Sequence, residues 1–289
     1  MSAPDPAKIE RFREKLRQEW TDAQTVAAWR KWHAQLSAFT RGATDAVLEA
    51  AQLRPGLNVL DLASGVGDPA LSIAESVGPG GHVTASDLGP GMLACAEEFA
   101  KSKALRNVAF CVADAEALPF PDRSFDVVSS RFGVMFFPQQ LRAFRECRRV
   151  LKTGGRVAFV VWGKREQPFL SATIGVLMKY VEAPTPDRDA PHAFMFGERG
   201  LLESRLRAAG FTEVREEVRT VTGRWEGSPE DYWRQFTEVA APFRPLIAKL
   251  TPETRSKVEA EIFAGLRKLS DGRFLTMPLE IVIGTGAQT

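Results

Sequence analysis

The sequence is poor in the features that mark secreted, metal-binding or membrane-spanning proteins. It has three cysteines in 289 residues, Cys95, Cys111 and Cys147, which are far apart and lie in apolar stretches. That spacing favours small buried residues in a reducing compartment over a disulfide framework or a metal site. No apolar run approaches the roughly 18 residues that a membrane span needs, and the N-terminus lacks the apolar core of a signal peptide. We expect a cytoplasmic protein that binds no metal.

The sequence also lacks an excess of charge of either sign. Its 38 basic and 36 acidic residues give a net charge of +2, so no overall field draws it to nucleic acid or to an anionic membrane. The basic residues between Arg11 and Arg17 alternate with glutamates, which is typical of the charged face of a helix. No recognisable RNA-binding module accompanies them. We therefore expect no nucleic-acid partner, and RNA methylation stays a weak alternative.

Hydrophobic residues make up 44% of the chain, enough for one large α/β domain or a core with an appended subdomain. Between residues 57 and 162, short apolar segments alternate with helical ones. The predicted strands are 57–62, 83–86, 108–112, 125–130 and 156–162, the predicted helices are 69–77, 91–101 and 139–151, and a tight turn is predicted over Lys152 to Gly155. This alternation predicts a doubly wound parallel sheet.

Two helical regions lie outside that alternation. Apolar residues recur at helical spacing between Lys8 and Phe39, with a break near Thr21 and Asp22, residues that cap helices well. A second helical region, 228–270, separates two further predicted strands, 212–221 and 279–285. An insertion at that position can cover the edge of the sheet where ligands bind.

The segment from Val59 to Ala70, VLDLASGVGDPA, predicts a strand, a glycine turn and the start of a helix. Gly65 and Gly67 allow backbone torsions that other residues rarely adopt, and they let the backbone come close to a ligand. The N-terminus of the following helix points its free N–H groups at the same place. The pattern G-x-G-x-x-A is shared by dinucleotide and S-adenosylmethionine pockets, and a plain tight turn is its simplest explanation. The residues that surround this segment in the sequence decide between these interpretations.

Acidic residues lie at the ends of three of the predicted strands: Asp61 just before the glycine turn, and Asp87 and Asp114 just after the second and third strands. A single aspartate after a strand is usually a turn former or a helix cap, but in an open parallel sheet the strand ends line the ligand crevice. Asp87 follows Gly67 by twenty residues, where a carboxylate can accept hydrogen bonds from a ribose diol, and Asp114 can accept one from an exocyclic amine. An NAD-dependent dehydrogenase explains the glycines and Asp87 equally well.

Five motifs in order resemble the class I S-adenosylmethionine-dependent methyltransferases, in particular the branch similar to the enzymes of ubiquinone and menaquinone biosynthesis. The motifs occupy residues 59–69, 83–93, 114–120, 125–128 and 149–155. Ser86 and Thr153 depart from the family pattern without affecting the chemistry. The resemblance implies a Rossmann-like methyltransferase fold: a seven-stranded, mostly parallel sheet whose last strand is antiparallel, with a helical cap.

The resemblance also implies S-adenosylmethionine as cofactor and S-adenosylhomocysteine as product. Gly65 and Gly67 then approach the methionine part, Asp87 holds the ribose, Leu88 and Met92 flank the adenine, and Asp114 with the Ala115 N–H meets the adenine edge. The full set of expected cofactor contacts is Asp61, Ala63, Gly65, Gly67, Asp87, Leu88, Met92, Asp114, Ala115, Ser130 and Arg131.

On this basis the chain is expected to divide into five parts. They are an N-terminal helical lid (1–45), the cofactor-binding core (46–165), an acceptor-side segment with the sixth strand (166–227), a helical cap insertion (228–270) and a final strand that returns to the core (271–289).

Methyl transfer from a sulfonium needs chiefly a well-placed acceptor in a pocket closed to water, and a general base only if the acceptor must lose a proton. The candidate bases are His33, in the lid, and His192, in a loop after the fifth strand. For each residue a structural role is the alternative.

The aromatic residues expected near the ligand edge favour a small aromatic acceptor, with a quinone-like or phenolic ring as the leading class. The expected pocket residues are Trp29, Trp32, Phe132, Phe136, Trp162 and Phe196, and core packing is the alternative for any one of them. A protein that binds S-adenosylmethionine without catalysis is the rival interpretation. The sequence leaves open O-, N- or C-methylation and the oligomeric state.

Overall fold

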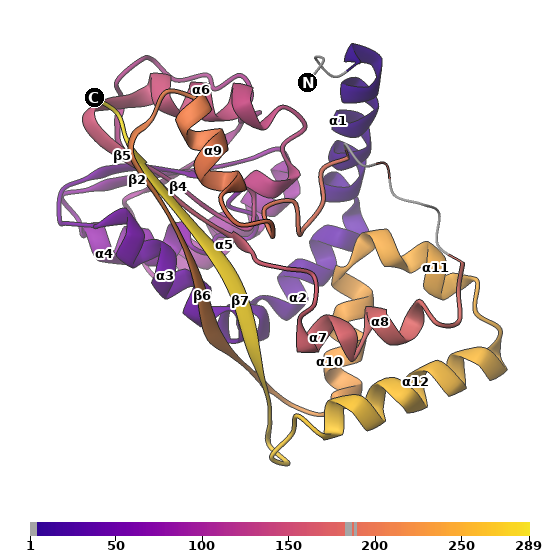
Figure 1. The fold of residues 1–289 in the computed structure, drawn as a ribbon. Helices are drawn as coiled ribbons and strands as arrows, with labels where there is room; N and C mark the ends of the chain where they lie inside the picture. The colour runs from indigo at the N-terminus through magenta and orange to yellow at the C-terminus, as the bar shows by residue number, and fades with distance from the viewer. Residues whose placement is uncertain (1–4, 183–186, 188–189) are drawn as a thin grey trace.

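The computed structural model describes residues 5–182, 187 and 190–289, and its centre is a seven-stranded sheet with the order β3-β2-β1-β4-β5-β7-β6 (Figure 1). The strands are β1 (Asn58–Leu62), β2 (His82–Asp87), β3 (Val108–Val112), β4 (Phe125–Arg131), β5 (Leu151–Trp162), β6 (Thr212–Glu226) and β7 (Phe274–Ala287). The first five strands run parallel, and β7 is antiparallel to both of its neighbours. The predicted fold class and the antiparallel last strand are confirmed.

Helices cover both faces of the sheet. The helices are α1 (Pro6–Thr21), α2 (Ala23–Phe39), α3 (Arg41–Ala51), α4 (Ala70–Val77), α5 (Pro90–Ser102), α6 (Gln140–Val150), α7 (Pro168–Ser171), α8 (Ile174–Leu177), α9 (Leu201–Ala208), α10 (Pro229–Val239), α11 (Arg244–Ala248) and α12 (Pro252–Arg267), with short 3₁₀ turns η1 (Val134–Phe136) and η2 (Ala241–Phe243). In the described part of the chain, no helix combines the length and the apolar character that crossing a bilayer requires.

Alternation along β1 explains the two-sided core. Leu60 and Leu62 belong to one buried cluster with residues of α6 and α9, whereas Val59 belongs to another with residues of α3 and α4. Successive side chains of a strand point to opposite faces, so a strand buried on both faces is apolar nearly throughout. The short apolar strands of the core were therefore readable from the sequence.

The N-terminal helices break where the sequence predicts. Asp22 ends α1 and caps α2, accepting a hydrogen bond from the Thr25 backbone N–H at 2.8 Å. Helix α3 was not predicted. It buries Ala43, Ala46 and Val47 against the sheet, so the boundary expected at residue 45 falls inside a core helix.

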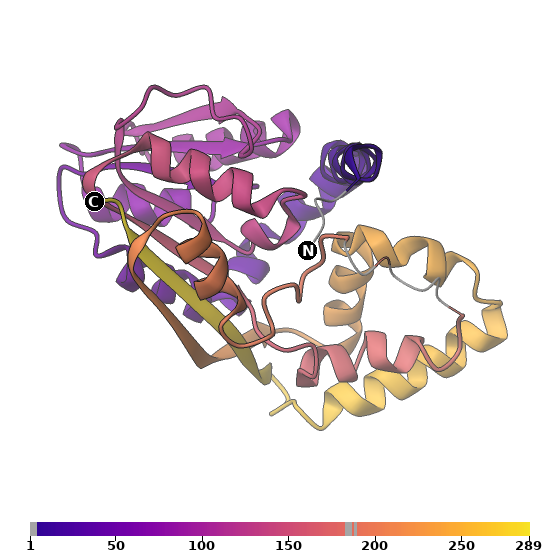
Figure 2. The ribbon, with the colours of Figure 1, turned by 45° about the horizontal axis from the view of Figure 1, so that its top comes forward.

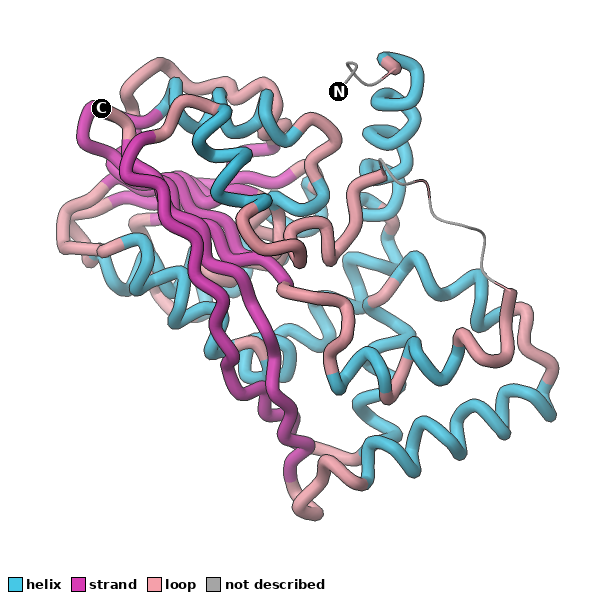
Figure 3. The backbone as a smooth tube through the Cα atoms, viewed as in Figure 1, coloured by secondary structure: helices cyan, strands magenta, loops and turns pink. Residues whose placement is uncertain are grey.

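The hairpin of β6 and β7 is longer than predicted and reaches beyond the other strands toward the cap (Figure 3). Helices α10, α11 and α12 lie between these two strands in sequence, as expected for the insertion. Figure 2 shows these helices grouped with α7 and α8 to one side of the sheet. Together they enclose a separate apolar cluster, to which α2 contributes Trp32 and Phe39. The cap is thus packed against the second N-terminal helix as well as the hairpin.

The predicted tight turn over Lys152 to Gly155 is wrong, because these residues belong to β5. The pairing with β4 shifts register here, and Gly154 has a φ of +80°. The backbone N–H of Gly154 donates to the Gln288 carbonyl, and the Gln288 N–H donates to the Gly155 carbonyl. A glycine-based irregularity thus kinks the strand without ending it.

Candidate functional site

The order of the strands reverses between β1 and β4, which are neighbours in the sheet although β2 and β3 intervene in sequence. Helices α4 and α5 follow β1 and β2 on one face, and α6 follows β4 on the other. In open parallel sheets the ligand crevice lies beyond the carboxyl ends of the strands at this point, which here are the ends of β1, β2 and β4.

The glycine loop after β1 gives its two glycines different roles. Gly65 has a φ of +53°, and a Cβ added to it would meet no described atom within 4 Å. Gly67 has a φ of +109°, and a Cβ there would lie 3.0 Å from Leu71 Cδ1 of α4. Gly65 leaves open space that a ligand can use, whereas Gly67 permits close packing of the loop on its helix. Ala63, which also has a positive φ of 53°, lies in the same loop.

Asp87, at the end of β2, joins two loops of the crevice. Its Oδ2 accepts a hydrogen bond from the Gly65 N–H at 2.9 Å, and its Oδ1 accepts one from the Gly89 N–H at 2.8 Å. Burial raises the pKa of this carboxyl, although the N–H groups of Gly89 and Gly65 act in the opposite direction. Each carboxylate oxygen can accept a second hydrogen bond, so Asp87 retains acceptors for ribose hydroxyls.

Asp61, in β1, is a buried carboxyl with an unused oxygen. The residue is 0% exposed, and its Oδ1 accepts a hydrogen bond from Ser129 Oγ at 2.7 Å. Its Oδ2 has no hydrogen-bond partner within the described residues. Burial raises the pKa of Asp61 to about 7, although Ser129 and the charge of Arg131 oppose the shift. A buried acceptor without a partner is rare and suits a cationic ligand group nearby.

Arg131, at the end of β4, is held inside the protein. Its guanidinium donates to Thr40 Oγ1 and to the Asp68 carbonyl, and lies 3.1 Å from Asp68 Oδ2. Thr44 Oγ1 of α3 also donates to the Asp68 carboxylate. The side chain of Arg131 is 10% exposed, and its Nε is buried without a partner in the described structure. Arg131 thus ties the end of α2 to the glycine loop, a role that the sequence did not reveal.

The end of β4 packs tightly on the glycine loop. Ser130 Oγ donates to the Leu62 carbonyl at 2.9 Å. A Cβ added to Gly133 would lie 2.5 Å from Ala63 Cβ and 2.6 Å from Ser130 Oγ. Ser130, predicted as a cofactor contact, is buried and engaged in this packing.

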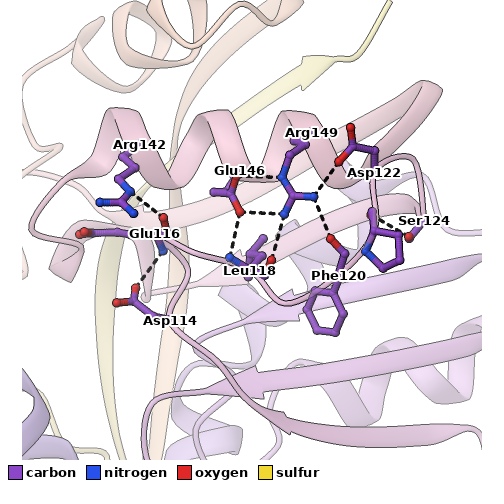
Figure 4. Close-up of polar contacts among 10 residues, drawn as sticks. Asp114, Glu116, Leu118, Phe120, Asp122, Ser124, Arg142, Glu146 and Arg149 are labelled. Atoms are coloured by element: carbon purple, nitrogen blue, oxygen red, sulfur yellow. Dashed lines mark hydrogen bonds and ion pairs between the residues drawn. The ribbon is translucent and has the colours of Figure 1, made fainter.

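The loop after β3 carries the residues expected at the adenine. Asp114 Oδ1 accepts a hydrogen bond from the Glu116 N–H at 2.8 Å, and the Ala117 N–H donates to the Asp114 carbonyl. Ala115 is 8% exposed, and Leu88, directly after β2, is partly exposed. The turn at Asp114 leaves its second carboxylate oxygen directed away from the backbone of the loop (Figure 4).

Helix α6 fastens that loop to the core. Arg149 donates to the Leu118 carbonyl at 2.9 Å and to the Phe120 carbonyl at 2.8 Å, while Glu146 accepts from the Leu118 N–H (Figure 4). Arg142 Nε donates to the Glu116 carbonyl at 2.8 Å. These contacts hold the loop after β3 against α6. Arg149 stands in one of the recognised motifs, but its target was not apparent there.

Two of the expected pocket aromatics stack at the ends of β4 and β5. The rings of Phe132 and Trp162 have centroids 4.0 Å apart and planes 11° apart. Phe132 has a φ of +60°, which is rare for a large side chain and concentrates at functional sites. Phe136, in η1, packs edge-on against Trp20 at the end of α1.

The other expected pocket residues lie elsewhere. Trp29 packs with Val66 and Met92, between α2 and the glycine loop. Trp32 is 7% exposed and donates from Nε1 to Glu238 Oε2 of the cap. Phe196 is 0% exposed and stacks on Phe144 of α6. Its position is therefore a correction to the expected pocket: Phe196 fills the core between α6 and the following loop.

The two candidate bases are separate from each other. His33 stacks on Phe99 of α5 with ring centroids 4.1 Å apart, and burial lowers its pKa. His192 Nδ1 accepts a hydrogen bond from the Phe194 N–H at 3.1 Å, and burial together with Arg165 lowers its pKa. While that bond holds, the neutral ring of His192 carries its proton on Nε2 and has no free lone pair for another.

The chemistry of the crevice fits S-adenosylmethionine. Gly65 leaves open space, Asp61 offers a buried oxygen to the ammonium group of the methionine part, and Asp87 has acceptors for the ribose. Asp114 stands at the third strand end with an oxygen available to an exocyclic amine. Trp29 and Met92 provide apolar cover beside the loop.

Comparisons with known proteins agree with this chemistry. The model of the ubiE/COQ5 methyltransferase family matches residues 29–184, more than half of the chain. The demethylmenaquinone methyltransferase of Listeria welshimeri is 30% identical over 184 residues, which cover 63% of this chain and 73% of that protein. The ubiquinone/menaquinone biosynthesis C-methyltransferase UbiE of a Shewanella species is 33% identical over 178 residues, covering 58% and 71%.

The fold is also found among solved structures. A Bacillus halodurans protein proposed to be a methyltransferase aligns with a TM-score of 0.55 and 22% identity, covering 85% of this chain and 98% of its own. This likeness concerns the fold. The family match ends before α10, α11 and α12, so the cap lies outside the part that the family model describes.

Proposed function

The chain belongs to the ubiE/COQ5 methyltransferase family and is an S-adenosylmethionine-dependent methyltransferase, and from that premise we propose that it methylates a small quinone-like or phenolic ring. The observation that carries the proposal is the Phe132–Trp162 stack at the ends of β4 and β5, beside the crevice. Relatives whose names include demethylmenaquinone and ubiquinone/menaquinone biosynthesis support the same acceptor class. Membership of this family sets the dehydrogenase alternative aside.

In this proposal the strand ends hold the cofactor. Asp87 accepts from the ribose hydroxyls, Asp114 from the adenine amino group, and Asp61 faces the ammonium group. Arg131 holds the glycine loop in place through Asp68, and its buried Nε is available to the carboxylate of the methionine part. Leu88 and Met92 provide the apolar sides of the adenine site.

When bound, the cofactor supplies a methyl group on a sulfonium that needs no further activation. The protein therefore contributes position and exclusion of water. Aromatic faces at Phe132 and Trp162 align a flat acceptor, while Trp20 and Phe136 close the side next to α1. The contacts of His192 and His33 support a role in packing and loop geometry rather than in proton transfer.

A methyl-transfer screen with labelled cofactor tests the acceptor class, using quinols, phenols, amines and carboxylic acids. We expect product from quinols or phenols, and we expect Trp162→Leu to raise KM for that acceptor more than it lowers the affinity for S-adenosylhomocysteine. Tyr180→Leu, a change at an exposed aromatic of the outer surface, is the matched control. Transfer confined to amines or acids would contradict the proposed acceptor.

A further inference from the structure

Helix α1 has little apolar contact with the rest of the protein. Across its described residues Pro6–Thr21, Ile9 is the one side chain that is buried. In Figures 1 and 2 the helix projects beyond the sheet and its flanking helices. Since helices in proteins are stabilised mainly by packing, the position of α1 must depend on a few specific contacts.

Arg13 makes the most buried of these contacts. Its Nη2 donates to Glu116 Oε2 at 2.5 Å, across 103 residues of sequence, and its Nε lies 3.6 Å from Asp114 Oδ2. The Glu116 side chain is 3% exposed, and that of Arg13 is 19% exposed. Burial by itself lowers the pKa of Arg13. The hydrogen bonds and negative charges of Glu116, Glu10 and Asp114 outweigh this effect, so the pKa of Arg13 is raised.

Glu116 is fixed independently of Arg13. Its Oε1 accepts a hydrogen bond from the Gln139 N–H at 2.6 Å, and its backbone carbonyl accepts one from Arg142. Arg13 therefore binds a pre-positioned carboxylate, and its Nε is thereby placed beside Asp114. The Asp114 Oδ1 is already held by the Glu116 N–H, so Arg13 faces the remaining oxygen, Oδ2.

We infer that Arg13 is a positioning residue for the cofactor, because it orients the Asp114 carboxylate toward the adenine amino group. The same contacts hold α1 over the adenine side of the crevice. The inference rests on the proposed cofactor site. It assigns a task to α1, which precedes residue 29, where the family match begins. Release of the cofactor then requires the contacts of Arg13 with Glu116 and Asp114 to break.

Other contacts lie at the two ends of α1. Lys8 pairs with Asp187 at 2.7 Å, and Trp20 packs on Phe136 and Trp29. The chain bends at Asp22, which also pairs with Arg244 of the cap at 3.3 Å. Trp20 and Trp29 therefore lie next to the bend, where their fluorescence reports the position of the helix.

The test compares wild type, Arg13→Ala and Arg13→Lys, with Arg17→Ala as the matched control. Arg17 lies on the same helix, is 49% exposed and pairs with Glu14 one turn away. Two probes are titrated: S-adenosylhomocysteine, and its inosine analogue, which carries an oxygen in place of the adenine amino group. Thermal unfolding without ligand checks that each variant is folded, and stopped-flow tryptophan fluorescence measures the dissociation rate.

For Arg13→Ala we expect weaker binding of S-adenosylhomocysteine and faster dissociation, each by about tenfold, the scale of one charge-assisted hydrogen bond. We expect the preference for adenosine over inosine to fall by a similar factor, with Arg13→Lys intermediate and Arg17→Ala like wild type. Equal weakening of both probes would overturn the inference, since α1 would then be a simple cover. An unchanged preference and rate would also overturn it. Wild type that binds neither probe would instead overturn the proposed cofactor site.

Discussion

The backbone N–H of Gly65 and the Oδ2 of Asp87 lie 2.9 Å apart, so the loop after β1 is fastened directly to the loop after β2. The same carboxylate accepts from Gly89 through its other oxygen. Two loops that the sequence presents as separate motifs therefore form one rigid wall of the crevice. The carboxylate that faces the ribose in the proposed site also shapes the turn that faces the methionine part.

Replacing Asp87 by alanine is expected to weaken binding of S-adenosylhomocysteine by about 1–3 kcal/mol, because ribose hydroxyls and two loop N–H groups lose their acceptor. Isothermal titration calorimetry measures the change in Kd. Glu97→Ala, on the exposed face of α5, is the control and should bind as wild type does. Unchanged affinity of the Asp87 variant would show that the ribose lies elsewhere.

Asp61→Asn is expected to stabilise the free protein increasingly as the pH rises from about 4 to 7. The folded-state pKa of Asp61 is raised to about 7 from an ordinary value of 3.8, so between these values the folded state keeps a proton that the unfolded state releases. Rising pH therefore favours unfolding of wild type by at most about 1.4 kcal/mol per pH unit, and the neutral amide lacks this penalty. Urea unfolding at pH 5, 6, 7 and 8 measures the difference. A constant difference across that range would contradict the assigned pKa.

Gly133→Ala is expected to destabilise the protein by about 1–3 kcal/mol, because the added methyl group overpacks the contact between β4 and the glycine loop. The new Cβ would lie 2.5 Å from the Cβ of Ala63. Gly80→Ala is the control, since its added Cβ meets no described atom within 4 Å and its φ is ordinary. Chemical denaturation gives both free energies of unfolding. Equal free energies of unfolding for the two variants would mean that the glycine loop shifts to accommodate the added methyl group without loss of stability.

His192→Ala is expected to keep kcat within about twofold, because the lone pair that could take a proton already accepts the Phe194 N–H. His33→Leu is expected to behave similarly, since its ring packs flat on Phe99. The readout is kcat against pH for each variant, with the acceptor found in the screen. Loss of kcat by about 100-fold or more, with a basic limb missing from the pH profile, would identify that histidine as the general base.

The predictions that succeeded depend on local patterns. The five core strands alternate or run apolar, the break at Asp22 has a good capping residue, and the antiparallel last strand came with the family resemblance. Helix α3 was missed because it is short and rich in alanine, and its burial depends on the sheet. The predicted turn over Lys152 to Gly155 is wrong because glycine residues also occur at irregularities within strands. The backbone hydrogen bonds of Gly154 and Gly155 with Gln288 decide for a strand irregularity over a turn.

The sequence by itself determined the family, the order of the core elements and the three carboxylates at the strand ends, because these features are properties of neighbouring residues. Tertiary structure alone decided that Arg131 holds Asp68 and Thr40, that Arg13 reaches Glu116, and that Phe196 belongs to the core. These contacts join residues far apart in the chain, and the spacing of residue types in the sequence does not predict contacts over such separations. Which side chain faces a ligand and which one packs is settled by how the elements meet.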